Sequence, residues 1–180
     1  MGTFEELMQL ISDIPANYHE ETFRMLYKYI PTLPEGEFLE FGTGLAKATC
    51  MIALCNPKLK ITTFDTAIPY NYPDYNEQIK QTLEKHGITE NVNHFIANSL
   101  EYETDLEFVG MNIDSGHSYE LTLAELKRWM PKVKKGGIVF NDDYLDNRVK
   151  VKKELDEYLI EHESEWEVLN NGMCLVMQKV

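Results

Sequence analysis

Two glycines and an aspartate in the first half of the chain have the spacing of a nucleoside-binding site. Gly42 and Gly44 follow a short apolar run, and glycines let the backbone turn sharply and approach a ligand without a Cβ in the way. Asp65 lies 23 residues after Gly42, where a carboxylate can accept hydrogen bonds from both hydroxyls of a ribose. The third glycine of a dinucleotide loop is missing, because Ala46 and Lys47 occupy that region. The pattern predicts a nucleoside-containing cofactor and does not separate NAD from S-adenosylmethionine.

Polar residues also end three later apolar runs, at Asn98 and Ser99, at Asp114, and at Asp142 and Asp143. In an open α/β sheet the carboxyl ends of the parallel strands lie along one edge, and ligands bind there, near the point where the strand order reverses. We therefore expect these residues to share one site with the glycine loop.

The elements that must position this site follow from hydrophobic periodicity. Helices are predicted over 4–11, 22–30, 46–53, 77–86, 121–130 and 146–160, and strands over 37–41, 60–64, 91–96, 108–113 and 137–140. Gly136 and Gly137 are interpreted as a turn, and Val149, Leu155, Leu159 and Ile160 as the buried face of the last helix. The turn Asn171-Gly172 joins 166–169 to 173–178 as a hairpin.

Strands that alternate with helices predict a single α/β domain. Its sheet is expected to be Rossmann-like, doubly wound, mostly parallel and seven-stranded, with a C-terminal antiparallel hairpin and N-terminal helices. Residues 1–34 are expected to form a helical cap or dimer contact within this domain, and residues 35–180 the cofactor-binding part. An uncovered apolar face of the first helices would offer a homodimer interface.

Composition narrows the classes of function. The 180 residues carry a net charge of −13, and 43% of them are hydrophobic, which suits a globular core and disfavours binding to nucleic acid or an anionic membrane. The three cysteines lack metal-site spacing. Glu5 and Glu6 stand where a signal peptide would be basic, and no apolar run is long enough for a membrane span. A cytoplasmic location is expected.

Two segments in the second half resemble a known family. The segment 113–120, IDSGHSYE, and the segment 136–143, GGIVFNDD, look like class I S-adenosylmethionine-dependent methyltransferases. More narrowly, they are similar to the macrolide-sugar and catechol-type O-methyltransferases, which have IDGDHxY and GGxxxxDD segments. The upstream LEFGTG at 39–44 resembles the first cofactor motif of that group. The resemblance covers roughly residues 37 to 144.

This resemblance implies S-adenosylmethionine as cofactor and assigns binding residues. The methionine end would be held by Glu40, Phe41, Gly42, Thr43 and Gly44, the ribose by Asp65, and the adenine side by Asn98 and Ser99. The remaining cofactor-binding residues implied are Thr66, Asp114, Ser115 and His117.

The resemblance also implies a divalent cation, Mg²⁺ or another, held by Asp114, Asp142 and Asp143. Three carboxylates at adjacent strand ends would repel one another unless a cation neutralised them, and oxygen-only ligation favours Mg²⁺ or Ca²⁺ over zinc. The alternative is that Asp142 caps the following helix and Asp143 is solvated.

His117 and Asp114 are the predicted catalytic residues. An imidazole titrating near neutrality can take the proton of an acceptor hydroxyl, although His117 packing against the cofactor or capping a helix is an equal alternative. Gly116 departs from the family, because many relatives have an aspartate there. Either His117 replaces that aspartate as base or the activity is lost.

The leading hypothesis is therefore O-methylation of a small hydroxylated molecule. A non-catalytic S-adenosylmethionine-binding module is the alternative, and an NAD-dependent oxidoreductase is a remote one. His19 is assigned a surface or capping role. Tyr70, Tyr72 and Tyr75 are interpreted as packing residues, with contact to the acceptor as the alternative.

Overall fold

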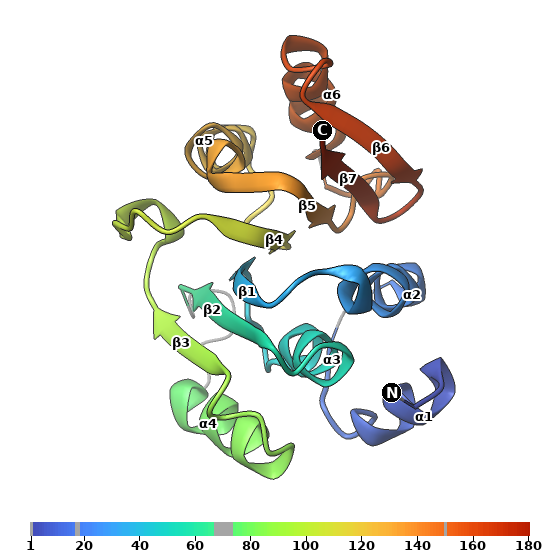
Figure 1. Ribbon diagram of the computed structural model, residues 1–180. Coiled ribbons are helices and arrows are strands. Elements are labelled where there is room, and N and C mark those ends of the chain that lie inside the picture. Colours follow the sequence, from blue (N-terminus) through green and yellow to red (C-terminus); the bar gives the residue numbers. More distant parts are fainter. Residues whose placement is uncertain (1, 17–18, 67–73, 150) are drawn as a thin grey trace.

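The computed structural model describes residues 2–16, 19–66, 74–149 and 151–180. The described residues form one seven-stranded sheet, as predicted, and its strand order is β3-β2-β1-β4-β5-β7-β6 (Figure 1). Their bounds are β1 Gly36–Phe41, β2 Leu59–Asp65, β3 Val92–Ile96, β4 Phe108–Ile113, β5 Val133–Asn141, β6 Trp166–Asn171 and β7 Leu175–Lys179. The first five pair in parallel, whereas β7 is antiparallel to both β5 and β6.

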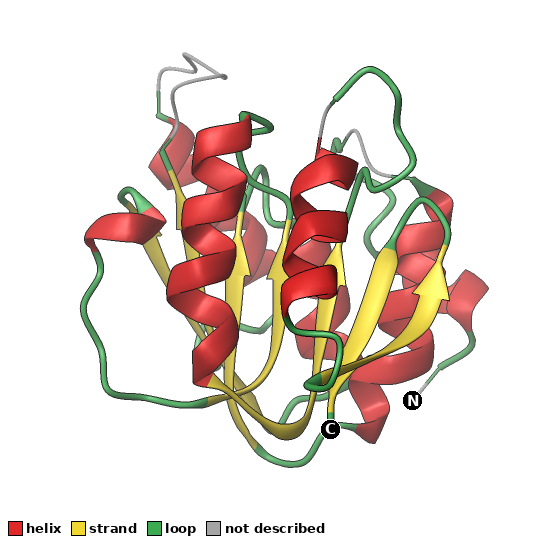
Figure 2. Cartoon of the chain, turned by 90° about the horizontal axis from the view of Figure 1, so that it is seen from above, coloured by secondary structure: helices red, strands yellow, loops and turns green. Residues whose placement is uncertain are grey.

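In the described part of the chain, six α-helices cover the two faces of the sheet (Figure 2). Their bounds are α1 Phe4–Leu10, α2 Glu20–Tyr29, α3 Lys47–Cys55, α4 Tyr75–Lys85, α5 Tyr119–Trp129 and α6 Val151–Glu161. The first four pack into one hydrophobic cluster and the last two into another, on opposite sides of the sheet (Figure 1). No described helix is long and apolar enough to cross a membrane.

Strand β1 lies at the switch point of the sheet, between β2 and β4. Its side chains alternate, with Phe38 in the cluster of α1 to α4 and Leu39 and Phe41 in the cluster of α5 and α6. A strand buried on both faces reads as a nearly continuous apolar run, which is why this strand was predictable. At the carboxyl end of β1 the connections to the neighbouring strands therefore run in opposite directions, and a ligand site forms there.

Two predicted elements are corrected. Helix α6 begins at Val151 and not at residue 146, and its buried residues include Leu155 and Tyr158, while Ile160 is 74% exposed. Strand β5 begins at Val133, so the predicted glycine turn lies inside it as an irregularity where the pairing register with β4 shifts. Gly136 has φ +81° there, a conformation that favours glycine.

Candidate active site

A cavity of about 1050 Å³ opens at the carboxyl ends of the parallel strands. It is lined by most of the residues selected from the sequence: Phe41, Gly42, Thr43, Gly44, Asp65, Thr66, Asn98, Ser99, Asp114, Ser115, His117 and Asp143. Two of the selected residues, Glu40 and Asp142, do not line it. The topology thus brings the ends of five strands to one cavity.

The glycine loop after β1 is held in an unusual backbone conformation. Gly42 has φ +86°, and a Cβ at this position would lie 1.8 Å from the carbonyl oxygen of Asp114. The Gly44 amide donates to Asp65 Oδ2 at 2.9 Å, and the Tyr75 hydroxyl donates to the Gly44 carbonyl at 2.7 Å. Tyr75 is buried, which confirms its packing role, whereas Tyr70 and Tyr72 lie outside the described residues. The loop is therefore fixed by β2, β4 and α4 together.

Glu40 lies beneath the cavity and not in it, which corrects the expectation of direct cofactor contact. Its carboxylate is fully buried and accepts hydrogen bonds from Thr49, from Thr63 at 2.7 Å and from Asn112 at 3.2 Å. Burial raises the pKa of Glu40 to about 7 despite these donors. The Thr63 hydroxyl also lies 2.7 Å from that of Thr43, so Glu40 supports the loop from below.

Glu125 is a buried lining residue that the sequence analysis missed. Its carboxylate accepts hydrogen bonds from Ser99, at 2.5 Å, and from Ser115, and burial raises its pKa. The sequence spacing did indicate that Glu125 is buried, because it places Glu125 on the same face of α5 as the buried residues Thr122 and Trp129. A carboxylate on the buried face of a helix needs hydrogen-bond partners, and here both are predicted site serines.

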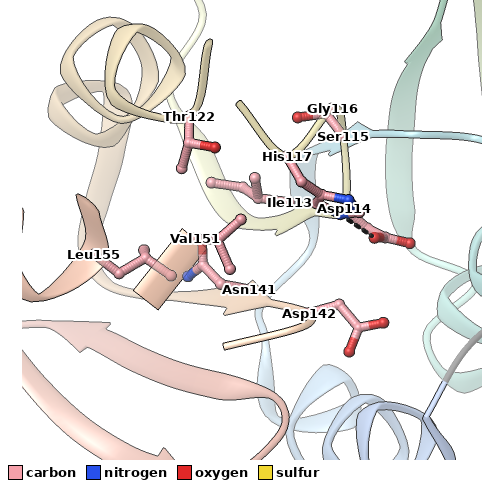
Figure 3. Close-up of a pocket in the computed structure, with 10 residues that line it drawn as sticks. All are labelled: Ile113, Asp114, Ser115, Gly116, His117, Thr122, Asn141, Asp142, Val151 and Leu155. Atoms are coloured by element: carbon pink, nitrogen blue, oxygen red, sulfur yellow. Dashed lines mark ion pairs between the residues drawn. The ribbon is translucent and has the colours of Figure 1, made fainter. Parts of the chain in front are cut away.

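Asp143 joins two histidines from distant parts of the chain. His117 Nε2 lies 3.2 Å from Asp143 Oδ2 and 3.7 Å from Asp114 Oδ1, and the second pair is drawn in Figure 3. His19 Nε2 lies 3.1 Å from Asp143 Oδ1 and 3.6 Å from Asp146 Oδ2. His19 precedes α2 but makes no side-chain cap. The surface or capping role assigned to it is therefore wrong, and Asp146 is a further residue that the sequence analysis missed.

Asp142 turns away from this group. Its carboxylate is buried and accepts a hydrogen bond from the Thr22 hydroxyl through Oδ1. It does not cap a helix, because α6 begins only at Val151. Among the described residues no donor reaches its Oδ2. Burial, with the charges of Asp114 and Asp143 adding to it, raises the pKa of Asp142 to about 7.

A small cavity of about 10 Å³ lies between Asp142, Asn141 and His117 (Figure 3). Both polar atoms of the Asn141 side chain are buried and lack partners among the described residues. Unpaired buried polar atoms are costly, but the orphaned Asp142 oxygen is not grouped with the carboxylates of Asp114 and Asp143. The described groups whose ligand atoms come together are Asp114, His117 and Asp143, and His19, Asp143 and Asp146.

The neighbouring carboxylates also change the pKa of His117. Interaction with Asp114 raises the pKa of His117, and the charges of Asp143 and Asp142 act in the same direction, against the effect of burial. A half-buried imidazole flanked by carboxylates can hold a proton taken from a neighbouring hydroxyl.

Comparison with known proteins places these features in a family. A family model described as a methyltransferase domain matches residues 39–144. These residues include the glycine loop, Asp65, Asp114 and Asp143. No match was found among curated proteins. This family supports neither NAD nor hydride transfer, so the oxidoreductase alternative is set aside.

Solved structures share the whole fold at low sequence identity. An O-methyltransferase from Bacillus cereus in complex with SAH has a TM-score of 0.67 and 15% identity, over 98% of this chain and 90% of that one. The TDP-rhamnose 3'-O-methyltransferase of calicheamicin biosynthesis has a TM-score of 0.68 and 18% identity, over 97% and 92%. An rRNA methylase from Streptococcus thermophilus has a TM-score of 0.65 and 15% identity, over 92% and 99%. The chain belongs to the methyltransferase domain family and has the Rossmann-like fold of class I methyltransferases.

Proposed function

We propose that this protein transfers the methyl group of S-adenosylmethionine to a hydroxyl of a small molecule. The observation that carries the proposal is that one cavity is lined both by the glycine loop with Asp65 and by the imidazole of His117 beside two carboxylates. A donor and an acceptor bound in the same cavity gain the rate advantage of fixed proximity and orientation.

The cofactor would lie along the strand ends. Asp65 would accept hydrogen bonds from the ribose hydroxyls, and the Gly42-Thr43-Gly44 loop with Phe41 would hold the methionine end. Asn98 and Ser99, with Thr66 and Ser115 nearby on the same cavity wall, would contact the nucleoside. Glu40 and Glu125 are positioning residues in this proposal, because each carboxylate fixes a part of that wall by hydrogen bonds.

His117 would act as the base. As the acceptor oxygen attacks the methyl carbon, a C–O bond forms and the S–C bond breaks. The hydroxyl proton passes to His117 Nδ1, because Nε2 faces the carboxylates of Asp114 and Asp143, and the products are a methyl ether and S-adenosylhomocysteine. Asp114 and Asp143 would stabilise the imidazolium through the contacts described above.

A divalent cation fits the same end of the cavity. Asp114 and Asp143 would hold it, whereas Asp142 is directed towards Thr22 and its ligand atoms do not come together with theirs. A bound cation supplies Lewis acidity that lowers the pKa of an acceptor hydroxyl.

A nucleic-acid acceptor is disfavoured, although two structural neighbours have the term rRNA methylase in their names. The net charge of −13 opposes the phosphate contacts that such binding needs. The similarity to a sugar O-methyltransferase is compatible with a small acceptor.

The first experiment is calorimetric titration of S-adenosylmethionine into the wild type, an Asp65→Ala variant and an Asp105→Ala control. Asp105 is exposed on the segment before β4, so its removal should leave affinity unchanged, while Asp65→Ala should weaken binding at least tenfold. An acceptor screen with Mg²⁺ and with EDTA follows. Binding without turnover of any hydroxylated acceptor would favour the non-catalytic module, and no binding to the wild type would contradict the proposal.

A further inference from the structure

We infer that His19, Asp143 and Asp146 form a second cation site, which takes a divalent first-row transition ion. This site goes beyond the proposed function, because it needs neither cofactor nor methyl transfer. It shares only Asp143 with the cation position considered above.

The distances between the ligand atoms suit a coordination shell. With metal–ligand bonds of about 2.1 Å, neighbouring ligand atoms lie about 3.0 Å apart in octahedral and about 3.4 Å apart in tetrahedral geometry. His19 Nε2 lies 3.1 Å from Asp143 Oδ1 and 3.6 Å from Asp146 Oδ2, and all three atoms lie within 4.8 Å of one another. An ion can therefore enter with little movement of the side chains.

The three side chains are partly buried and come from separate parts of the fold. The exposed fractions are 29% for His19, 15% for Asp143 and 8% for Asp146. His19 stands before α2, whereas both aspartates lie between β5 and α6. Two partly desolvated carboxylates repel each other unless a positive charge compensates them, and in this structure the Arg148 guanidinium supplies that charge at Asp146.

A second, matching group adjoins the first. Asp143 directs Oδ1 towards His19 and Oδ2 towards His117, and His117 also faces Asp114. Each group thus consists of one imidazole and two carboxylates, with Asp143 common to both. A carboxylate that offers one oxygen to each side has the form of a bridge between two ions.

The donor set determines the class of ion. Imidazole nitrogen suits zinc, nickel, cobalt and iron, while Mg²⁺ and Ca²⁺ prefer oxygen-only sites. The His19 group therefore differs in selectivity from the oxygen-only set predicted from Asp114, Asp142 and Asp143.

Arg148 competes for this site. Its guanidinium Nε donates to Asp146 Oδ1 at 2.9 Å and to Oδ2 at 2.8 Å, so it occupies the oxygen that faces His19. The Arg148 side chain is 80% exposed, whereas Asp146 is 8% exposed and is held through both of its oxygens. An ion must therefore displace Arg148 to bind Asp146, and removal of Arg148 should strengthen ion binding.

The test is titration of the whole chain, free of cofactor, with Co²⁺, followed by visible absorption and by calorimetry. His19→Ala should lower the affinity for at least one equivalent of Co²⁺ tenfold or more. Arg148→Ala should raise the affinity for that same equivalent. His162→Ala is the matched control, because His162 is paired with Glu165 at the far end of α6. Circular dichroism would verify that each variant is folded.

The inference is overturned if the wild type binds no Co²⁺, or if His19→Ala and wild type bind it with the same stoichiometry and affinity. The inference is supported if His19→Ala loses one Co²⁺ equivalent and if adding His19→Ala to an Asp114→Asn variant causes the same loss. This support does not depend on whether S-adenosylmethionine binds. A failed S-adenosylmethionine titration therefore does not decide the outcome of the Co²⁺ titration.

Discussion

Thr22 and Asp142, 120 residues apart in the chain, are joined by a hydrogen bond from the Thr22 hydroxyl to the Asp142 carboxylate. This bond ties the first turn of α2 to the end of β5, and both residues are buried. Because His19 stands immediately before α2, the bond also sets where that imidazole meets Asp143. The acidic side of the cavity thus depends on the packing of α2.

Thr22→Val should remove this donor while it keeps the shape of the side chain. A buried carboxylate oxygen left without its partner costs about 1–3 kcal/mol, so the free energy of unfolding should fall by that amount in urea titrations. Thr82→Val on α4 is the control, because its hydroxyl only bonds the Gln78 carbonyl within the same helix. Equal stability of the two variants would contradict the importance of the Thr22 bond.

Glu40 predicts a pH dependence of stability. Its pKa is raised from the ordinary 4.5 to about 7 in the folded protein, so its stabilising contribution is complete below about pH 4.5 and is lost as pH rises through about 7. The difference corresponds to about 3 kcal/mol. Glu40→Gln should therefore show a smaller loss of stability than the wild type between pH 5 and 8.

The measurement is urea unfolding at several pH values. Asp142, whose pKa is also about 7, titrates in the same pH range in wild type and in Glu40→Gln. Only the difference between the stability curves of these two proteins therefore reports on Glu40. Parallel stability curves for wild type and Glu40→Gln would show that Glu40 does not carry this effect.

Gly42→Ala and Gly87→Ala form a matched pair. Both glycines have positive φ, at +86° and +67°, but a Cβ at Gly42 would meet the Asp114 backbone, while a Cβ at Gly87 meets nothing within 4 Å. Backbone strain alone should cost Gly87→Ala about 1 kcal/mol. The added overlap should bring Gly42→Ala to about 3 kcal/mol or more, with S-adenosylmethionine affinity reduced only in this variant.

His117→Ala should separate binding from chemistry. Loss of a general base lowers kcat by about 10²- to 10⁴-fold, while calorimetry should find S-adenosylmethionine affinity within threefold of wild type. Added imidazole should restore part of the rate. An unchanged kcat would exclude His117 as the base.

Gly116→Asp tests the departure from the family pattern. A Cβ at this position would meet only the flexible end of Leu121, at 2.9 Å, so the variant should fold. If His117 is the base, Gly116→Asp should not raise kcat by more than about twofold in the same assay. A rise of tenfold or more would indicate that the wild type lacks its base.

Much of the fold was determined by the sequence alone. The strand 108–113 has the same bounds in the structure, and the predicted C-terminal hairpin forms, although Asn171 pairs with Leu175 at the end of β6 and is not part of the turn. Buried strands and amphipathic helices are encoded in local periodicity, and parallel strands align their carboxyl ends, so Gly42, Asp65 and Asp114 could be assigned to one edge of the sheet.

Only the tertiary structure decided which side chains meet at that edge. No local spacing links His19 to Asp143 or Thr22 to Asp142, because those contacts arise when α2 packs against β5. Periodicity specifies the face on which a side chain lies, whereas its partners depend on how the crossovers place one element against another. For that reason the glycine loop, Asp65 and Asp143 could be selected from the sequence, whereas the contacts of Asp143 with both His19 and His117 could not.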